Sequence, residues 1–199
     1  MSGKTPKRGR PPVTSAARIA RTALDLFVRN GFEQTTLDEV ATAAGVSRRT
    51  LFQYFPSKSA IVWHGSQEAY QALLEGLGEV RSVNTWRSRL ADAMMASLQF
   101  PDGDLDSLRL RLRLIEAEPS LQAHLYTDAQ PHLLAIAHRL AMVMGTDPDD
   151  LEPFVLARMA WTATVCALLW WARDGQGDPR DVARRALRLL GLEDAQQTL

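Results

Sequence analysis

Residues 36–55 have the sequence TLDEVATAAGVSRRTLFQYF, which predicts two short helices separated by a tight turn. Thr36 precedes Glu39 by three residues, the spacing at which side chains and backbone N–H groups cap a helix start reciprocally. Gly45 predicts the turn, because glycine adopts the backbone angles that a steep crossing of two helices requires. Ser47 is well placed to cap the second helix. This stretch therefore predicts a helix-turn-helix unit.

One further helix before this unit completes a small domain. Gly31 predicts its end as a left-handed cap. Its apolar residues recur at helical spacing from about residue 15, at Ile19, Ala20, Ala23 and Phe27. In the second helix of the motif, residues 48–54, Leu51 and Phe55 lie four apart and are expected to point into the core.

Charge is distributed unevenly along the chain. The formal total is zero, but residues 1–60 carry 10 basic and 4 acidic side chains, whereas residues 61–199 carry 13 and 19. A basic module on an acidic body predicts an anionic partner. Arginine pairs with guanine, glutamine with adenine, and threonine can meet the thymine methyl group. The motif therefore predicts a helix that reads the major groove of double-stranded DNA.

The predicted DNA contacts fall into three groups. On the reading helix and its cap they are Ser47, Arg48, Arg49, Thr50, Gln53 and Tyr54. Phosphate contacts are expected at Thr36, Tyr54 and Lys58. The basic arm, residues 1–13, carries Arg10 in an Arg-Gly-Arg-Pro run that predicts a minor-groove contact. The alternatives are a solvated helix face for the arginine pair and a solubilising tail for the arm.

The remaining residues predict helix after helix. Ser57 can cap a fourth helix from Lys58 to about Leu77, and another is expected over residues 84–100. Helices ending near Arg173 and Leu190 should open at Asp147-Pro148 and Asp178-Pro179. Residues 119–144 are predicted to be helical with a break near Thr127, because Pro131 fits a first turn better than an interior.

Residues 108–114 alternate leucine and arginine, which by period alone indicates a strand. No second strand candidate exists to pair with it, and a lone strand is not stable. We therefore expect a helix that buries Leu108, Leu112 and Ile115. The predicted fold is all-α with about nine helices. It comprises an arm (1–13), a helix-turn-helix DNA-binding domain (14–58) and a helical ligand-binding and dimerisation domain (59–199), with the junction near residues 56–60.

Four runs of this sequence resemble the DNA-binding domain of TetR-family transcriptional regulators. They are LDLF at 24–27, GFEQTT at 31–36, VATAAGVS at 40–47 and LFQYFPSK at 51–58. The resemblance implies a three-helix reader, a variable helical ligand domain, a homodimer and ligand-relieved repression. Carried over by position, it assigns Ser47, Thr50, Gln53 and Tyr54 to the reading helix, and Thr36 and Lys58 to phosphate contacts. Arg49 departs from the glycine or small residue common in the family, so the operators of relatives do not transfer.

Later segments are similar to the C-terminal domain of mycofactocin-system regulators. They run from Arg109 through EPSLQAH at 118–124 to Asp149-Asp150-Leu151. That resemblance implies an acyl-CoA-like effector, whose chain needs an apolar tunnel and whose head needs arginines. The candidate ligand residues are Trp86, Met94, Leu98, Arg109, Arg113, Ile136 and Trp161, with Arg111, Leu112 and Met159 as further candidates. The alternative for the apolar members is an ordinary hydrophobic core.

The two final long helices predict a dimer. Residues 154–172 are apolar around most of the helix circumference, and residues 182–190 are amphipathic. Together they can build a two-fold four-helix interface, as the resemblance also implies. The predicted interface residues are Leu168, Trp170, Leu187 and Leu190.

Catalytic and metal-binding roles are not expected. His124, Asp128 and His132 could form a metal face on one helix, but the predicted break near Thr127 disrupts it. Cys166, the single cysteine, lies in an apolar run and is expected to be buried and inert. The most apolar stretch, residues 159–172, is too short to span a membrane, and no cofactor motif is present. A cytoplasmic protein that is not an enzyme is expected.

The sequence thus predicts a ligand-responsive repressor that binds a palindromic operator as a homodimer. Two alternatives stay open. One is a DNA-binding regulator without a small-molecule sensor, controlled by a partner. The other is an acyl-thioester carrier with a vestigial DNA reader.

Overall fold

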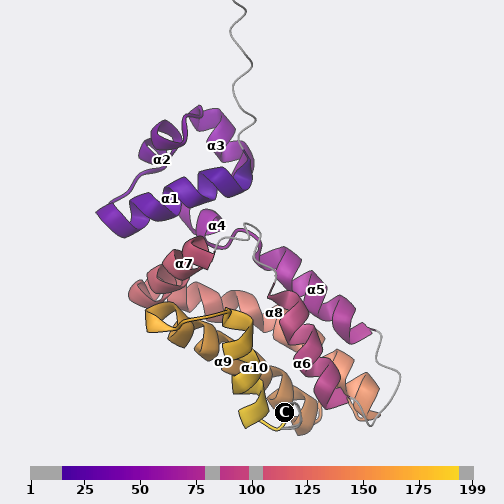
Figure 1. The fold of residues 1–199 in the computed structure, drawn as a ribbon. Helices are drawn as coiled ribbons and strands as arrows, with labels where there is room; N and C mark the ends of the chain where they lie inside the picture. The colour runs from indigo at the N-terminus through magenta and orange to yellow at the C-terminus, as the bar shows by residue number, and fades with distance from the viewer. Residues whose placement is uncertain (1–14, 79–85, 99–104, 193–199) are drawn as a thin grey trace, which may run out of the picture. The chain divides into compact units, whose positions relative to one another are not determined.

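The computed structural model describes residues 15–78, 86–98 and 105–192, and in these residues it contains helices and no strand (Figure 1). The chain divides into two compact units, Met1–Val62 and Trp63–Leu199. The predicted all-α class is confirmed. The described residues form ten helices where about nine were expected.

The first unit has four described helices: α1 (Ala16–Asn30), α2 (Leu37–Ala44), α3 (Arg48–Tyr54) and α4 (Lys58–Val62). Leu51 and Phe55 are buried in its core, as their spacing predicted. Phe27 meets Phe32 edge to face, with ring centroids 5.1 Å apart. Gly31 ends α1 with a positive φ of 90°, but its ψ of 144° lies outside the predicted left-handed helical region.

The second unit contains six described helices. They are α5 (Ser66–Gly78), α6 (Trp86–Ser97), α7 (Leu105–Ala117), α8 (Pro119–Met144), α9 (Leu151–Asp174) and α10 (Pro179–Leu189). Its main core gathers apolar side chains from α5, α6, α8, α9 and α10. α6 falls inside the predicted 84–100 helix, whose two ends lie outside the described residues.

The predicted single helix from Lys58 to Leu77 is wrong. α4 ends at Val62, and α5 begins only at Ser66 after a turn. Gly65 in that turn has a φ of 89°, a conformation that side-chain-bearing residues rarely adopt and that cannot continue a right-handed helix. This glycine therefore adds one helix to the expected number.

The predicted break near Thr127 is also wrong, because α8 runs uninterrupted through Pro131. A proline inside a helix removes one hydrogen bond to the carbonyl four residues earlier, here that of Thr127. Both residues are exposed, so water can hydrate this carbonyl. The buried side chains of Leu133 and Ile136 hold the helix on the core.

The two Asp-Pro pairs behave differently. Asp178 caps α10 as predicted, with its carboxylate accepting the backbone N–H of Arg180 at 2.8 Å. At the other pair, the helix begins later than predicted. Asp150 is the N-cap of α9, and its carboxylate accepts the N–H of Asp147 at 3.0 Å, which closes a turn before Leu151.

The alternating segment forms a helix, α7, as expected. Leu108, Leu112 and Ile115 are all buried on it. α7 packs against α8 and α9, whereas α9 also contacts α6 and α10. Side chains three and four residues apart share a helix face. In an alternating sequence the residue four positions on is of the same type and the residue three positions on is of the other type, so leucines and arginines both lie on the buried side.

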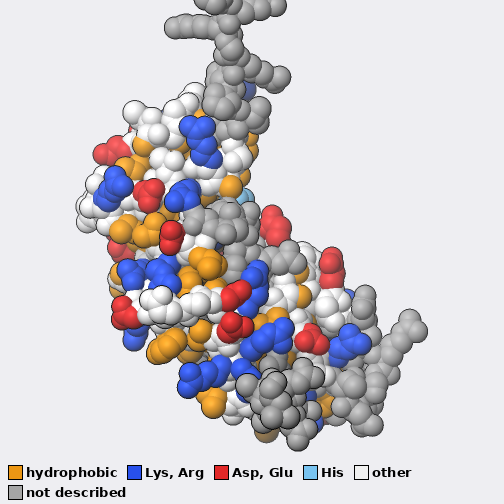
Figure 2. Space-filling model, in the orientation of Figure 1, with side chains coloured by type: hydrophobic (Ala, Val, Ile, Leu, Met, Phe, Trp, Pro, Cys, Tyr) orange, Lys and Arg blue, Asp and Glu red, His pale blue; other side chains and the backbone are white. Residues whose placement is uncertain are grey.

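α9 is long and apolar enough, by length and composition alone, to cross a membrane. Its contacts with four other helices of its unit instead mark it as a core helix. Less than half of its most apolar window is buried, however. Figure 2 shows apolar side chains between charged ones on the visible surface of this unit. α9 therefore has more apolar surface than the other helices of its own unit cover.

Candidate functional site

Thr36 starts α2 through a complete capping box. Its hydroxyl oxygen accepts the N–H of Glu39 at 3.2 Å, and its own N–H donates to the Glu39 carboxylate at 2.7 Å. These hydrogen bonds to Thr36 lower the pKa of Glu39. The predicted cap is confirmed, and it leaves the Thr36 side chain exposed at the helix start.

The turn between α2 and α3 has the predicted geometry. Gly45 has φ 69° and ψ 33°, in the left-handed region, and its N–H donates to the carbonyls of Ala41 and Thr42. Ser47 then caps α3 by accepting the N–H of Thr50 at 3.0 Å. The two hydroxyl groups of Ser47 and Thr50 also lie 2.8 Å apart. The start of the predicted reading helix is thus fixed in place.

The two arginines of α3 have different environments. Arg48 donates to the Asp38 carboxylate on α2 at 3.0 Å, and its guanidinium lies 5.5 Å from the centre of the Phe52 ring. Arg49 and Gln53 are exposed and have no partner among the described residues. Tyr54 is exposed as well. The face that remains available on α3 is therefore centred on Arg49 and Gln53.

Lys58 has a structural role that its position in the sequence did not reveal. Its ammonium donates to the carbonyls of Phe32 at 2.7 Å and Glu33 at 3.0 Å, and lies 4.8 Å from the Phe32 ring centre. Ser57 caps α4 as predicted, accepting the N–H of Ala60. Lys58 therefore ties the α1–α2 loop to α4. A DNA phosphate bound by Lys58 would have to share its ammonium with these two carbonyls.

Arg10, the predicted minor-groove contact, lies outside the described residues, as does the rest of the arm. In the second unit, five of the seven apolar residues predicted to contact a ligand are buried in one packed core. They are Trp86, Met94, Leu98, Ile136 and Trp161. Among the further candidates, Leu112 is buried at the smaller α7–α9 cluster and Met159 is exposed.

Arg109 and Arg113 are occupied by the end of α9. Arg109 donates to the carbonyls of Trp171 and Gly175 at 2.9 and 2.8 Å, and its guanidinium lies 4.1 Å from the centre of the Trp171 ring. Arg113 donates to the carbonyl of Ala172 at 2.7 Å. The last carbonyls of a helix have no partner within it, so these arginines satisfy them. While α9 ends in this conformation, neither arginine is free to bind the polar head group of a ligand.

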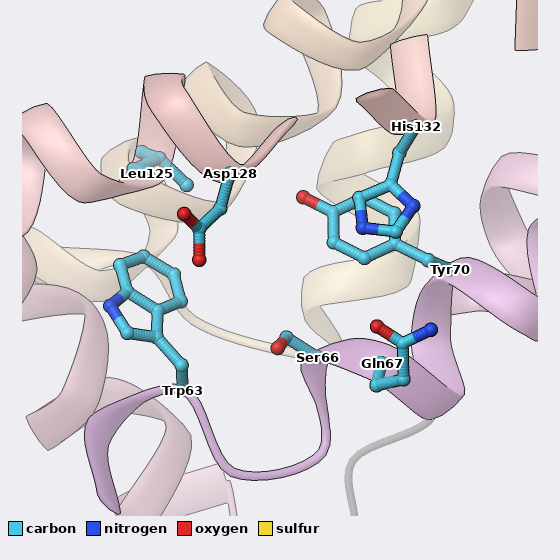
Figure 3. A pocket seen from close by; sticks show the side chains of 7 residues that line it. All are labelled: Trp63, Ser66, Gln67, Tyr70, Leu125, Asp128 and His132. Carbon is cyan, nitrogen blue, oxygen red and sulfur yellow. The ribbon is translucent and has the colours of Figure 1, made fainter. Parts of the chain in front are cut away.

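A hollow of about 330 Å³, including its open mouth, lies between the start of α5 and the middle of α8 (Figure 3). Its lining residues are Trp63, Ser66, Gln67, Tyr70, Leu125, Asp128 and His132. Most of them were not predicted from the sequence, in which only the spacing of Asp128 and His132 drew notice. Because the break in α8 is absent, these two side chains share one continuous helix face.

Aromatic rings and one carboxylate shape this pocket. The Tyr70 and His132 rings stack with centroids 3.7 Å apart and planes 9° apart. Burial raises the pKa of the Tyr70 phenol, although a hydrogen bond from Trp161 acts in the opposite direction. Burial also lowers the pKa of His132. Asp128 pairs with Nε2 of His124 at 2.8 Å. The pocket therefore contains neutral rings beside a negative charge.

No group of three metal-ligating side chains is arranged to hold a metal ion in the part of the chain that the structure describes. Two residues of the possible metal face, His124 and Asp128, pair with each other, whereas the third, His132, stacks on Tyr70. The expected burial of Cys166 is wrong, because this thiol is exposed. The side of α9 that carries it is not covered by the unit's core.

The predicted dimer residues divide into two kinds. Trp170 is 58% exposed, and Leu168 and Leu190 are partly buried. Leu187 is completely buried in the core, because the apolar side of α10 packs on α9 within its own unit. Leu189 is instead the most exposed large apolar residue described, at 83%. An interface on these helices would use Trp170 and Leu189, with Leu187 supporting them from within.

Comparison with known proteins identifies both parts of the chain. Residues 19–63 match the family described as "Bacterial regulatory proteins, tetR family", and residues 85–193 match the "MftR C-terminal domain". The second match alone spans more than half of the sequence. The chain therefore belongs to the tetR family of bacterial transcriptional regulators.

Relatives extend over most of the chain. MftR of Mycobacterium tuberculosis, named as a mycofactocin biosynthesis transcriptional regulator, is 34% identical over 83% of this chain and 84% of its own. The regulator TcmR of Streptomyces glaucescens is 29% identical over 78% and 73%. The structure of Thermus thermophilus FadR, a repressor in complex with lauroyl-CoA, is 26% identical with a TM-score of 0.52, covering 93% of this chain and all of that one.

Proposed function

We propose that this chain is a cytoplasmic repressor that binds a palindromic operator as a homodimer and releases it when a small hydrophobic or acyl-CoA-like effector binds. The observation that carries the DNA-binding role is the exposed pair Arg49 and Gln53, which has no partner among the described residues. The helix that carries the pair is fixed by the Ser47 cap and the Gly45 turn. Such a helix can enter the major groove, where these side chain types recognise guanine and adenine.

The contacts divide by what each side chain is free to do. Arg49, Gln53 and Thr50 read bases, whereas Thr36, Ser47 and Tyr54 contact phosphates at the helix starts and flank. Arg48 can contact DNA only after it breaks its hydrogen bond to the Asp38 carboxylate. Lys58 contributes mainly by fixing the loop, and Arg10 in the arm reaches the minor groove.

Effector binding releases DNA by a shift of population. The effector must bind the DNA-incompetent dimer more tightly than the competent one, because only differential affinity moves such an equilibrium. The acyl-CoA class is supported by the lauroyl-CoA that Thermus thermophilus FadR binds in its structure. An acyl chain would have to part the core around Met94 and Ile136, since both are now closely packed.

Operator binding is tested with fluorescently labelled DNA from upstream of the protein's own gene, followed by anisotropy against a scrambled duplex. Specific binding is expected, and lauroyl-CoA should abolish it while coenzyme A alone should not. Arg49→Ala should weaken specific binding by about 1–3 kcal/mol and relax the base preference. The matched control, Arg29→Ala on the exposed end of α1, should leave both unchanged. Equal loss on every sequence would make Arg49 a phosphate contact.

A regulator without a small-molecule sensor is the second candidate, and the filled core favours it. Five of the seven apolar residues predicted to contact a ligand are buried in the main core of the second unit. Operator binding that ignores lauroyl-CoA would support this candidate. An acyl-thioester carrier with a vestigial reader requires the opposite pattern, in which lauroyl-CoA binds and no DNA does.

A further inference from the structure

The pocket between α5 and α8 has a chemistry that an acyl thioester does not match. Figure 3 shows the Asp128 carboxylate between the Trp63 indole and the Tyr70 ring. Ser66 and Gln67 add neutral polar groups, and Leu125 is the single aliphatic lining residue. No lysine or arginine is among the described residues that line the pocket. A polyphosphate head would therefore meet a carboxylate without a lysine or arginine to bind the phosphates.

The same arrangement suits a positive charge. The faces of aromatic rings carry negative electrostatic potential, and a cation within about 6 Å of a ring centroid is attracted to it. Asp128 pairs with His124, yet its side chain is 56% exposed and an ionised carboxylate can accept several hydrogen bonds. Burial lowers the pKa of His132 and so favours its neutral form, which preserves the negative character of the site.

The aromatic walls are held from behind. His132 stacks on the Tyr70 ring, and Trp161 donates a hydrogen bond to the Tyr70 oxygen. On the other side, the Trp63 ring lies 5.4 Å from that of His124. The indole N–H of Trp63 is buried and has no hydrogen-bond partner among the described residues. The rings are thus positioned before any ligand arrives, which reduces the entropy cost of binding.

We propose that this pocket binds a small organic cation, an amine or quaternary ammonium compound, with its charge at Asp128 and its apolar substituents against Trp63 and Tyr70. This is a site of a different chemical class from the acyl-thioester effector. It stands apart from operator binding, because the ligand can be detected on the protein without DNA.

The experiment compares two probes of matched shape. Choline carries a quaternary nitrogen where 3,3-dimethylbutan-1-ol has a neutral carbon. Both are titrated into the full-length protein at neutral pH by isothermal calorimetry, with saturation-transfer NMR for weak binding. Choline should bind at least about tenfold more tightly than the alcohol. Asp128→Asn should remove this preference, whereas Asp92→Asn, an exposed carboxylate change on α6, should retain it.

Each other result overturns the proposal. If the alcohol binds as tightly as choline, the pocket recognises shape and apolar surface without charge. Absence of choline binding to the wild-type protein at millimolar concentrations would also overturn it. If Asp92→Asn loses the preference as fully as Asp128→Asn, the effect comes from overall charge. Circular dichroism melts of both variants establish that they are folded, and the two-probe comparison on wild-type protein needs no variant.

Discussion

Thr36 illustrates how one side chain serves the fold and, by our proposal, the DNA complex. Its hydroxyl oxygen accepts the Glu39 N–H that would otherwise lack a partner at the start of α2. The hydroxyl remains exposed, where it can also face a phosphate. Loss of DNA binding in a Thr36 variant therefore has two physical sources, which must be measured separately.

Thr36→Ala should lower the free energy of unfolding by about 1 kcal/mol, because an unsatisfied cap costs about that amount. Thr42→Ala is the matched control in the same helix, since its hydroxyl only donates to the Asp38 carbonyl. That variant should change stability by less than about 0.5 kcal/mol. Urea denaturation followed by circular dichroism measures both. An equal cost for the two variants would show that the capping box contributes no special stability.

His132 predicts a pH-dependent stability. Burial lowers its pKa below the ordinary 6.5, so the unfolded chain takes up a proton before the folded protein does. The stability present above pH 6.5 should therefore fall as the pH is lowered toward the folded-state pKa. Unfolding free energies measured between pH 8 and pH 5 should fall less in His132→Gln. The exposed His138 provides the control, and His138→Gln should keep the wild-type pH profile.

At the scale of helices, the sequence predicted most of what local signals determine. The caps at Thr36, Ser47 and Asp178 and the turn at Gly45 are all where their residue types indicated. Such features depend on a few neighbouring residues and on backbone conformation. The candidate reading face followed from the same local pattern, because its residues lie on one short helix.

Features that depend on tertiary contacts were harder to predict. The continuity of α8 through Pro131 reflects packing that outweighs one lost hydrogen bond. The carbonyl contacts of Arg109 and Arg113 join residues about sixty positions apart, which no local pattern reveals. The pocket likewise joins the start of α5 to the middle of α8. The Gly65 turn had a local signal, but the surrounding helical pattern obscured it.

The end of α9 should depend on the arginines of α7. Arg109→Met keeps much of the apolar stem but removes the side-chain donor to the carbonyls of Trp171 and Gly175. The Trp171 carbonyl still accepts the backbone N–H of Gly175, so the loss falls mainly on the Gly175 carbonyl. We expect a loss of about 1–3 kcal/mol in the free energy of unfolding, typical of unsatisfied buried polar groups. Arg185→Met on the exposed side of α10 is the control. Thermal and urea unfolding of both variants decides whether the loss is specific to position 109.

For the whole molecule, the uncovered side of α9 and α10 is the feature that the proposed dimer would explain. Trp170 and Leu189 are both largely exposed, while Leu187 is buried. α9 and α10 pack against each other, and large apolar residues left exposed on such a pair of helices indicate a partner. Two copies related by a two-fold axis would each cover the other's residues.

Trp170→Arg should therefore separate the dimer without unfolding the protomer. Sedimentation velocity at micromolar concentration is expected to show monomers, with an unchanged helical circular dichroism spectrum. Met142→Arg is the control, since Met142 is 66% exposed on α8, which is not one of the two helices of the proposed interface. It should remain dimeric. By contrast, Leu187→Ala should cost about 2–5 kcal/mol of stability, as expected for a core position. A dimeric Trp170→Arg protein would exclude this interface.

The exposed thiol of Cys166 makes the motion of α9 observable. Cysteine occurs once in the sequence, so a nitroxide label attaches at one position per protomer without removal of other thiols. Cys166 lies one helical turn from Trp170 on α9, so sedimentation velocity must first show that the labelled protein is still a dimer. In a two-fold dimer the two labels give a single distance, which pulsed electron paramagnetic resonance measures as a distribution. Its shift on adding operator DNA, lauroyl-CoA or choline would report directly which of them moves this helix.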